Sequence, residues 1–94
     1  MQKFLIHREI PGAGNLTPEE LKGIAARSVK VLSDLNREGH DIQWIQSFVS
    51  GDAITCVYLA PDEQTLREHA MRGNFPANAI TPVKGTIDPL TAES

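Results

Sequence analysis

Three histidines, one cysteine and one tyrosine are the side chains of this 94-residue chain whose types could do chemistry. His7 and Glu9 are two residues apart in an alternating segment, so a strand would place both side chains on one face, about 6 to 7 Å apart. Such a pair could act as general base and orienting acid, or as two metal ligands. The alternative is a solvated strand edge or a salt-bridged contact.

His69 is the second candidate. A neutral imidazole is the commonest protein ligand of divalent transition metals, but one ligand does not hold an ion. His7 and Glu9 would have to converge on His69, or a second copy would have to supply donors. No HxxxH or CxxC pair strengthens the metal hypothesis. The alternative is a half-buried histidine that donates to a backbone carbonyl.

Two neighbouring segments carry further candidates. Cys56 could be a ligand or a nucleophile, although a thiol in an apolar strand more often packs as a small hydrophobe. Trp44 and Tyr58 could stack a planar ligand, and Gln46 or Tyr58 could donate a hydrogen bond to it. The predicted ligand pocket therefore consists of His7, Glu9, Trp44, Gln46, Cys56 and Tyr58.

Periodicity and capping signals place these residues on elements. Thr17, Pro18 and Glu20 form a complete helix start signal, and Asp62 is typical of a second helix N-cap. Strands are predicted for residues 3–10, 42–49, 53–59 and 80–87, helices for residues 17–36 and 62–73, and a loose tail for residues 88–94. Residues 11–15 are interpreted as a flexible connection.

The resulting order, β-α-β-β-α-β, predicts one α+β domain over residues 1–94. This order on this scale is typical of the ferredoxin-like fold, a four-stranded antiparallel sheet with both helices on one face. We expect the helix-covered face to carry Phe4, Ile6, Ile45, Val49, Val57 and Leu59. We expect the other face to carry His7, Glu9, Trp44, Gln46, Phe48, Cys56 and Tyr58. Three aromatic rings are costly to leave in water, so a homodimer or a ligand pocket should cover them.

Composition excludes several classes of protein. A formal net charge of -3 gives no reason to bind nucleic acid. No run approaches the roughly 20 apolar residues that cross a bilayer, so no membrane partner is expected. A lone cysteine favours a reducing compartment, and we expect the protein in the cytoplasm.

The sequence also resembles a family of small bacterial ferredoxin-like domains of unknown function that includes a nickel-responsive, nickel-binding protein. The resemblance covers nearly the whole chain. The segments that carry it are His7-Arg8-Glu9, residues 16–21 (LTPEEL), Trp44-Ile45-Gln46-Ser47, Cys56-Val57-Tyr58, Ala60-Pro61-Asp62, residues 66–70 (LREHA), Phe75-Pro76-Ala77 and Ile87-Asp88-Pro89. It implies a ferredoxin-like fold, a dimer, and a bound divalent metal, nickel, with no established reaction.

Three functions follow as hypotheses. The first is a homodimer that binds a metal ion, nickel by resemblance, through His69, His7 and Glu9, or that binds a small ligand. The second is an enzyme without an organic cofactor, similar to the monooxygenases and isomerases of the dimeric α/β barrel type, with His7 or His69 as base. The third is a structural or regulatory protein-interaction domain.

Overall fold

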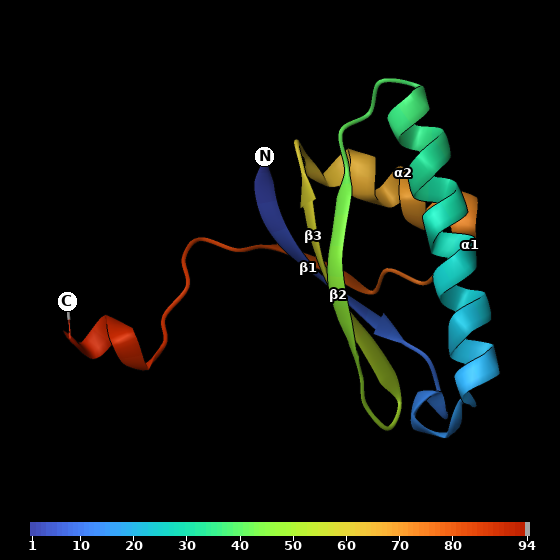
Figure 1. Cartoon of the computed structure of the whole chain (residues 1–94), viewed down its shortest axis with the longest axis horizontal. Helices are drawn as coiled ribbons and strands as arrows, with labels where there is room; N and C mark the ends of the chain where they lie inside the picture. The colour runs from blue at the N-terminus through green and yellow to red at the C-terminus, as the bar shows by residue number, and fades with distance from the viewer. Residues whose placement is uncertain (94) are drawn as a thin grey trace.

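The computed structural model describes residues 1–93, and Ser94 lies outside the described residues. The main elements follow the predicted order (Figure 1): β1 (Gln2–Glu9), α1 (Pro18–Arg37), β2 (Gln43–Val49), β3 (Ala53–Ala60), α2 (Glu63–Gly73) and β4 (Ala79–Pro82). Two short 3-10 helices, η1 (Ala13–Asn15) and η2 (Pro89–Glu93), follow β1 and end the described chain. The four strands form one antiparallel sheet of order β2-β3-β1-β4, which confirms the ferredoxin-like α+β fold.

Both helices begin where the capping residues predict. The Thr17 hydroxyl accepts from the Glu20 amide, and the Glu20 carboxylate accepts from the Thr17 amide, so the capping box is complete. Asp62 caps α2 by accepting from both the amide and the hydroxyl of Thr65. These bonds satisfy backbone donors that a helix start otherwise leaves unpaired.

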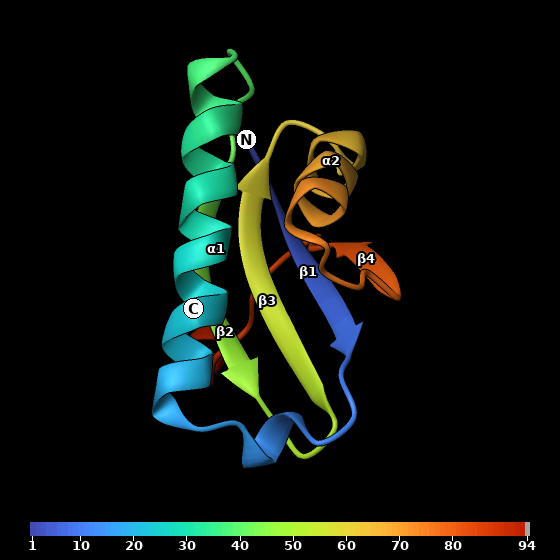
Figure 2. The same ribbon diagram turned by 90° about the vertical axis from the view of Figure 1, so that its right-hand side faces the viewer.

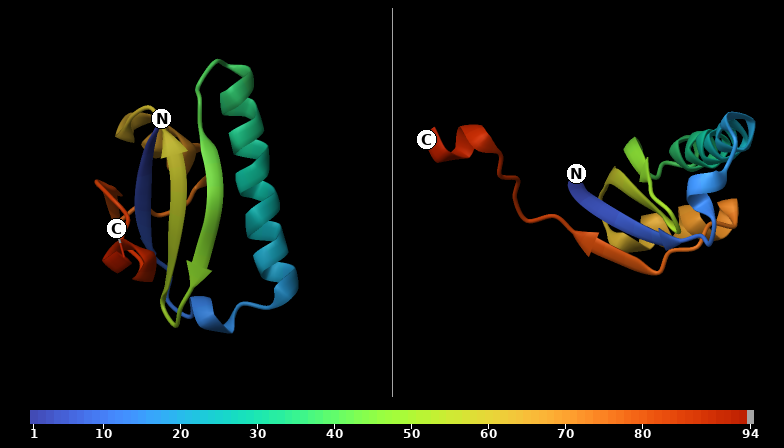
Figure 3. Two further views of the ribbon diagram at one scale, coloured as in Figure 1. Left: turned by 60° about the vertical axis from the view of Figure 1, so that its left-hand side comes forward. Right: turned by 90° about the horizontal axis from the view of Figure 1, so that it is seen from below.

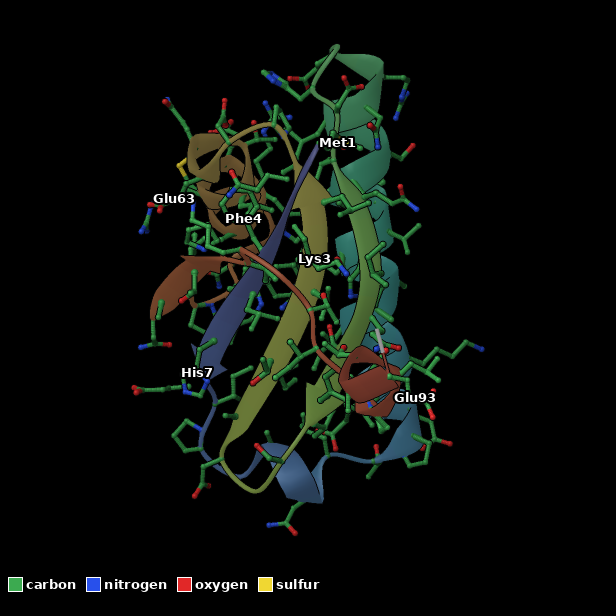
Figure 4. All side chains as sticks on the ribbon, turned by 90° about the vertical axis from the view of Figure 1, so that its left-hand side faces the viewer. Met1, Lys3, Phe4, His7, Glu63 and Glu93 are labelled. Carbon is green, nitrogen blue, oxygen red and sulfur yellow. The ribbon has the colours of Figure 1, made fainter. Side chains whose placement is uncertain are left out.

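The helices lie on one side of the sheet, as Figure 2 shows from that side. The core between the layers is built from alternate residues of the central strands, Phe4 and Ile6 of β1 with Tyr58 of β3, together with Leu35 of α1 and Leu66 of α2. The opposite face of the sheet, called the open face below, is covered by neither α1 nor α2. Figure 4 looks onto that face.

The predicted orientation of β3 is wrong. Cys56 and Tyr58 point toward the helices and are buried, whereas Val57 and Leu59 face the open side. Residues directly opposite each other on antiparallel strands share a face, and Tyr58 pairs with Phe4. Because both phases of β3 are mostly apolar, its alternation could not decide between the faces; the pairing with β1 does.

The predicted orientation of the first half of β2 is also wrong. The register between β2 and β3 shifts between Trp44 and Gln46, so Ile45 is an extra residue. The shift brings Trp44 opposite Tyr58 and turns its ring toward the helices, while Ile45 becomes exposed. Beyond the bulge, Phe48 faces the open side and Val49 the helices, as predicted.

The last strand is shorter than predicted. Its pairing with β1 runs to Pro82, one last bond joins the Val83 amide to the Lys3 carbonyl at 2.9 Å, and β4 lies at an edge of the sheet, where a proline is tolerated. From there the chain leaves the sheet and runs away from the body of the molecule, on the side of the open face (Figure 3). Its apolar side chains Ile87 and Leu90 are 85% and 69% exposed. In residues 1–93, no helix is long and apolar enough to cross a membrane.

Candidate functional site

Arg8 is the most unusual residue of the buried layer. It follows Phe4 and Ile6 on the inward side of β1, and only 3% of it is exposed. Its Nη1 donates to the Pro76 carbonyl at 2.6 Å, and its Nε donates to Cys56 Sγ at 3.4 Å. Its Nη2 is buried and has no hydrogen-bond partner in the structure. Both N–H groups of Nη2 are therefore left without an acceptor.

The positive charge of Arg8 is likewise unmatched. Among the ion pairs of residues 1–93, none includes Arg8. Its guanidinium lies 5.2 Å from the centre of the Phe75 ring, a cation–π contact that compensates part of the lost hydration. An isolated buried cation normally costs several kcal/mol unless an anion pairs with it.

The end of α2 places Phe75 beneath Arg8. Asn74 takes the left-handed conformation with φ 55°, and the Phe75 amide then donates back to the Ala70 carbonyl at 2.8 Å, closing the helix. A Cβ atom on Gly73 would lie 2.2 Å from the Phe75 ring. Gly73 therefore leaves the space into which the ring folds.

A pocket of about 210 Å³ opens between α1 and the sheet, next to Arg8. It is called the α1 pocket below. Most of its wall is apolar. Its lining is Arg8, Ile10, Leu21, Ile24, Ala25, Ser28, Trp44, Ser47, Val49, Ile54, Cys56, Tyr58 and Phe75.

Two aromatic groups shape the β2 side of this pocket. The Trp44 and Tyr58 rings stack with their centres 6.5 Å apart, at an interplanar angle of 21°. The Trp44 indole donates to the Ser47 hydroxyl at 2.9 Å, which satisfies its only polar atom. The bulge at Ile45 thus turns an indole into a fixed wall of the pocket.

Behind the pocket, Ser28 of α1 connects to His69 of α2. The Ser28 hydroxyl is 3.1 Å from His69 Nε2, and His69 is fully buried between the Tyr58 and Phe75 rings. Burial lowers the pKa of His69 to about 4, with a further contribution from the Arg8 charge, while the Ser28 hydrogen bond opposes the change. His69 is therefore neutral at physiological pH, and its Nδ1 is buried without a partner.

Tyr58 adds a second polar group to the lining. Burial raises the pKa of its phenol, and interactions with Ser28 and Arg8 only partly counter that rise. The phenol thus remains an O–H group near neutral pH and can donate a hydrogen bond.

The open face holds the other predicted residues. His7 and Glu9 project there from β1, and Gln46 projects there from β2; Figure 4 labels His7. The Asn78 side chain donates to the Glu9 carboxylate at 3.2 Å and accepts from the Glu9 amide at 2.7 Å. His7 and Glu9 line a shallow depression together with Asp52.

The predicted metal ligands do not gather in one protomer. His69 lies under the helices, whereas His7 and Glu9 lie on the opposite side of β1, so the three cannot share one ion. Throughout residues 1–93, no group of three or more His, Cys, Asp or Glu side chains could hold a metal ion. The side chains of a single chain therefore do not fit a complete nickel site.

Three of the six predicted pocket residues, Trp44, Cys56 and Tyr58, do line one pocket, although on the face opposite to the predicted one. Neither His7 nor His69 lines it. Sequence reasoning missed Arg8 and Ser28. Arg8 had a signal: it follows Phe4 and Ile6 in the buried phase of a strand, where a charged residue is rare unless paired.

The connection between β1 and α1, predicted to be flexible, is hydrogen-bonded to the β2–β3 turn, and its first residue, Ile10, lines the α1 pocket. Backbone amides of Ile10 and Gly14 donate to the carbonyls of Asp52 and Gly51, and the Gly12 amide donates to the Asp52 carboxylate at 2.9 Å. A Cβ atom on Gly14 would lie 3.1 Å from the Gly51 backbone. The connection is thus tied to the β2–β3 turn.

The fold and the pocket define a small ferredoxin-like domain with an apolar site between one helix and the sheet. Residues 4–83 match the family described as nickel responsive protein SCO4226-like, and the chain belongs to that family. The crystal structure of SCO4226 from Streptomyces coelicolor A3(2) is similar, with a TM-score of 0.74, 16% sequence identity, and coverage of 90% of this chain and 99% of that one. At this identity the likeness shows the fold alone. No curated protein matches the chain.

Proposed function

We propose that this protein is a small-ligand-binding domain and that the α1 pocket is its binding site. One observation carries the proposal. Arg8, only 3% exposed, borders an apolar pocket; its Nη2 has no hydrogen-bond partner, and no anion lies beside its charge. Sites for small molecules combine apolar walls with a few placed polar groups in this way.

The cost of burying Arg8 arises on folding, before any ligand binds. Folding removes most of the hydration of the guanidinium, and the Pro76 carbonyl, the Cys56 sulfur and the Phe75 ring replace only part of it. A ligand with an anionic group compensates this charge and offers Nη2 the acceptor that it lacks, for which the covered guanidinium has to turn toward the pocket. The incomplete compensation of Arg8 therefore favours a ligand that brings an acceptor to this pocket.

Chemical-shift mapping of the ¹⁵N-labelled protein with neutral, anionic and cationic fragments tests the proposal. We expect bound fragments to move the amide signals of Ser28 and Cys56, which line the pocket from opposite layers. Ala25→Leu fills the pocket from α1 and should abolish these shifts. Ala26→Leu, on the exposed side of α1, is the matched control. Fragments that bind both variants equally would place binding elsewhere.

Nickel binding is the second candidate. Two observations support it: the description of the family, and the depression on the open face that is lined by His7, Glu9 and Asp52. Because these donors do not make a site in one chain, we propose that nickel would bind between two copies, each supplying part of the ligand set.

Melting temperatures measured with and without nickel chloride test this candidate, since an ion that binds only the folded protein raises the melting temperature. We expect a rise in the wild type, none in His7→Ala, and an unchanged rise in His40→Ala. His40 is exposed and not part of the depression. A rise that persists in His7→Ala excludes the open-face site.

A homodimer through the open face completes the proposal. Phe48 is 56% exposed there, Val57 lies two residues along β3 from its partner Thr55, and Val57 pairs with Leu5 of β1. Contiguous apolar surface of this kind commonly marks an interface. Sedimentation of the wild type and of Phe48→Lys over a range of concentrations tests it: only the wild type should associate.

We also propose a cytoplasmic location, because the one cysteine is a free thiol.

A further inference from the structure

We propose that the ligand of the α1 pocket is a small monocarboxylate: one carboxylate head that accepts from Arg8, on an apolar body about the size of a single ring. This inference rests on the proposed function and narrows it to a chemical class. It depends on three features of the pocket: its charge, its free donors and its volume.

The charge of the pocket calls for one negative charge. Arg8 is the only charged residue in the lining, and neither Asp nor Glu borders the pocket. A neutral ligand would leave the buried cation uncompensated, and a dianion would bury a surplus negative charge, which is costly in an apolar site. A monoanion balances the guanidinium.

The free donors favour a carboxylate over a larger oxyanion. The Pro76 carbonyl and Cys56 Sγ take two of the five N–H groups of Arg8, and neither hydrogen of Nη2 has a partner. The Tyr58 phenol, kept protonated by burial, supplies a further donor in the same lining. A planar guanidinium matches the two oxygens of a carboxylate. A doubly charged phosphate or sulfate is disfavoured by its charge, since Arg8 is the one charged residue of the lining.

The volume and walls define the rest of the ligand. A dry cavity of about 150 Å³ lined by apolar side chains holds a benzene molecule. The α1 pocket, at about 210 Å³, has room for a ring and a carboxylate. Leu21 and Ile24 of α1 face Ile54 of β3 across it, and the Trp44 indole forms a flat side wall. Such walls suit a flat apolar body.

Benzoate is a suitable probe, and benzamide is its neutral analogue of nearly the same shape. Trp44 is the only tryptophan and lines the pocket, so its fluorescence reports binding directly. We expect benzoate to bind the wild type at least tenfold more tightly than benzamide, because the charge-assisted bond to Arg8 is made only by the anion. Arg8→Met should remove this tenfold preference, and Arg67→Met, which removes an exposed arginine, should leave it unchanged.

The outcomes separate the two proposals. Binding of benzamide as tight as that of benzoate overturns the carboxylate class but leaves a ligand pocket standing. Tighter binding of phenyl phosphate than of benzoate overturns it in favour of a dianion. No fluorescence change with any probe, together with no fragment hits in the Ala25→Leu comparison, overturns both proposals. The comparison of benzoate with benzamide on the wild type decides the class even if Arg8→Met does not fold.

Discussion

The two faces of the sheet differ in the surroundings of their polar groups, which are paired or solvated on one face and buried without full pairing on the other. On the open face, Glu9 is bound by Asn78 and His7 is in water. On the helix-covered face, Arg8 has a free buried donor and His69 is held neutral. The difference teaches that successive residues of one strand serve different layers: His7 and Glu9 lie on the open face and Arg8 in the buried layer. Only the buried layer fixes the charge and orientation of its groups in advance, which recognition of a small molecule requires.

The strongest test of this contrast compares neighbouring apolar residues of β1. Ile6 is fully buried, whereas Leu5 is partly exposed on the open face. We expect Ile6→Ala to lower the free energy of unfolding by about 3 kcal/mol, and Leu5→Ala to lower it by less than about 1 kcal/mol. Chemical denaturation at a protein concentration low enough to prevent association measures both values. Equal losses would mean that the two faces are buried alike.

Acid should destabilise the buried layer through His69. Its folded pKa of about 4 is below the unfolded value of 6.5, so the unfolded chain binds the proton more readily. The contribution of neutral His69 to the free energy of unfolding is complete above pH 6.5 and is lost as the pH falls toward 4. The loss between pH 7 and pH 5 amounts to about 2 kcal/mol.

Urea unfolding at both pH values measures this contribution. His69→Gln should reduce the loss between pH 7 and pH 5 by about this amount, whichever way it changes the stability at pH 7. His7→Gln, on the exposed side of the same sheet, is the control and should follow the wild type. A wild-type loss that persists in His69→Gln would assign the acid response to another group.

Arg8→Met tests whether the buried arginine stabilises the fold. Breaking a buried ion pair costs about 3 to 5 kcal/mol, but Arg8 has no such pair to break. The gain from removing a desolvated cation should nearly offset the lost bond to the Pro76 carbonyl. We expect the free energy of unfolding to change by less than about 1 kcal/mol. A loss of several kcal/mol in urea unfolding would instead make Arg8 a structural residue.

The smallest expected effect is on the open face. Phe48 is 56% exposed, so Phe48→Ser should change the stability of the isolated protomer by about 0.5 kcal/mol or less. Thermal unfolding of dilute and concentrated samples separates this value from association. If the proposed homodimer forms, the wild type should become more stable with concentration and the variant should not. A large loss in the dilute variant would show that Phe48 already packs within one chain.

The sequence predicts the elements of this fold well, because their signals are local. Thr17, Glu20 and Asp62 fix the helix starts through bonds within a few residues. Phe4 and Ile6 reveal the phase of β1, because Lys3, His7 and Glu9 in the other phase are polar. The same signals place each candidate residue on its strand or helix.

The sequence predicts less of the candidate site, because the site depends on contacts between distant segments. The phase of β3 is set by its pairing with β1, and the orientation of Trp44 is set by the one-residue bulge at Ile45. The phase of β1 marks Arg8 as a buried charge, but only the structure shows that its partners are the Pro76 carbonyl and a sulfur, with no carboxylate among them. Neither local propensity nor alternation contains that information.

The tied connection between β1 and α1 has a consequence for the rate at which a ligand enters. Because Gly12 and Gly14 are bonded to the β2–β3 turn, the rim beside the α1 pocket is already in place before a ligand arrives. Mixing experiments should then give a single phase whose observed rate rises linearly with ligand concentration. A plateau at high concentration would reveal a slow opening step that this rim does not provide.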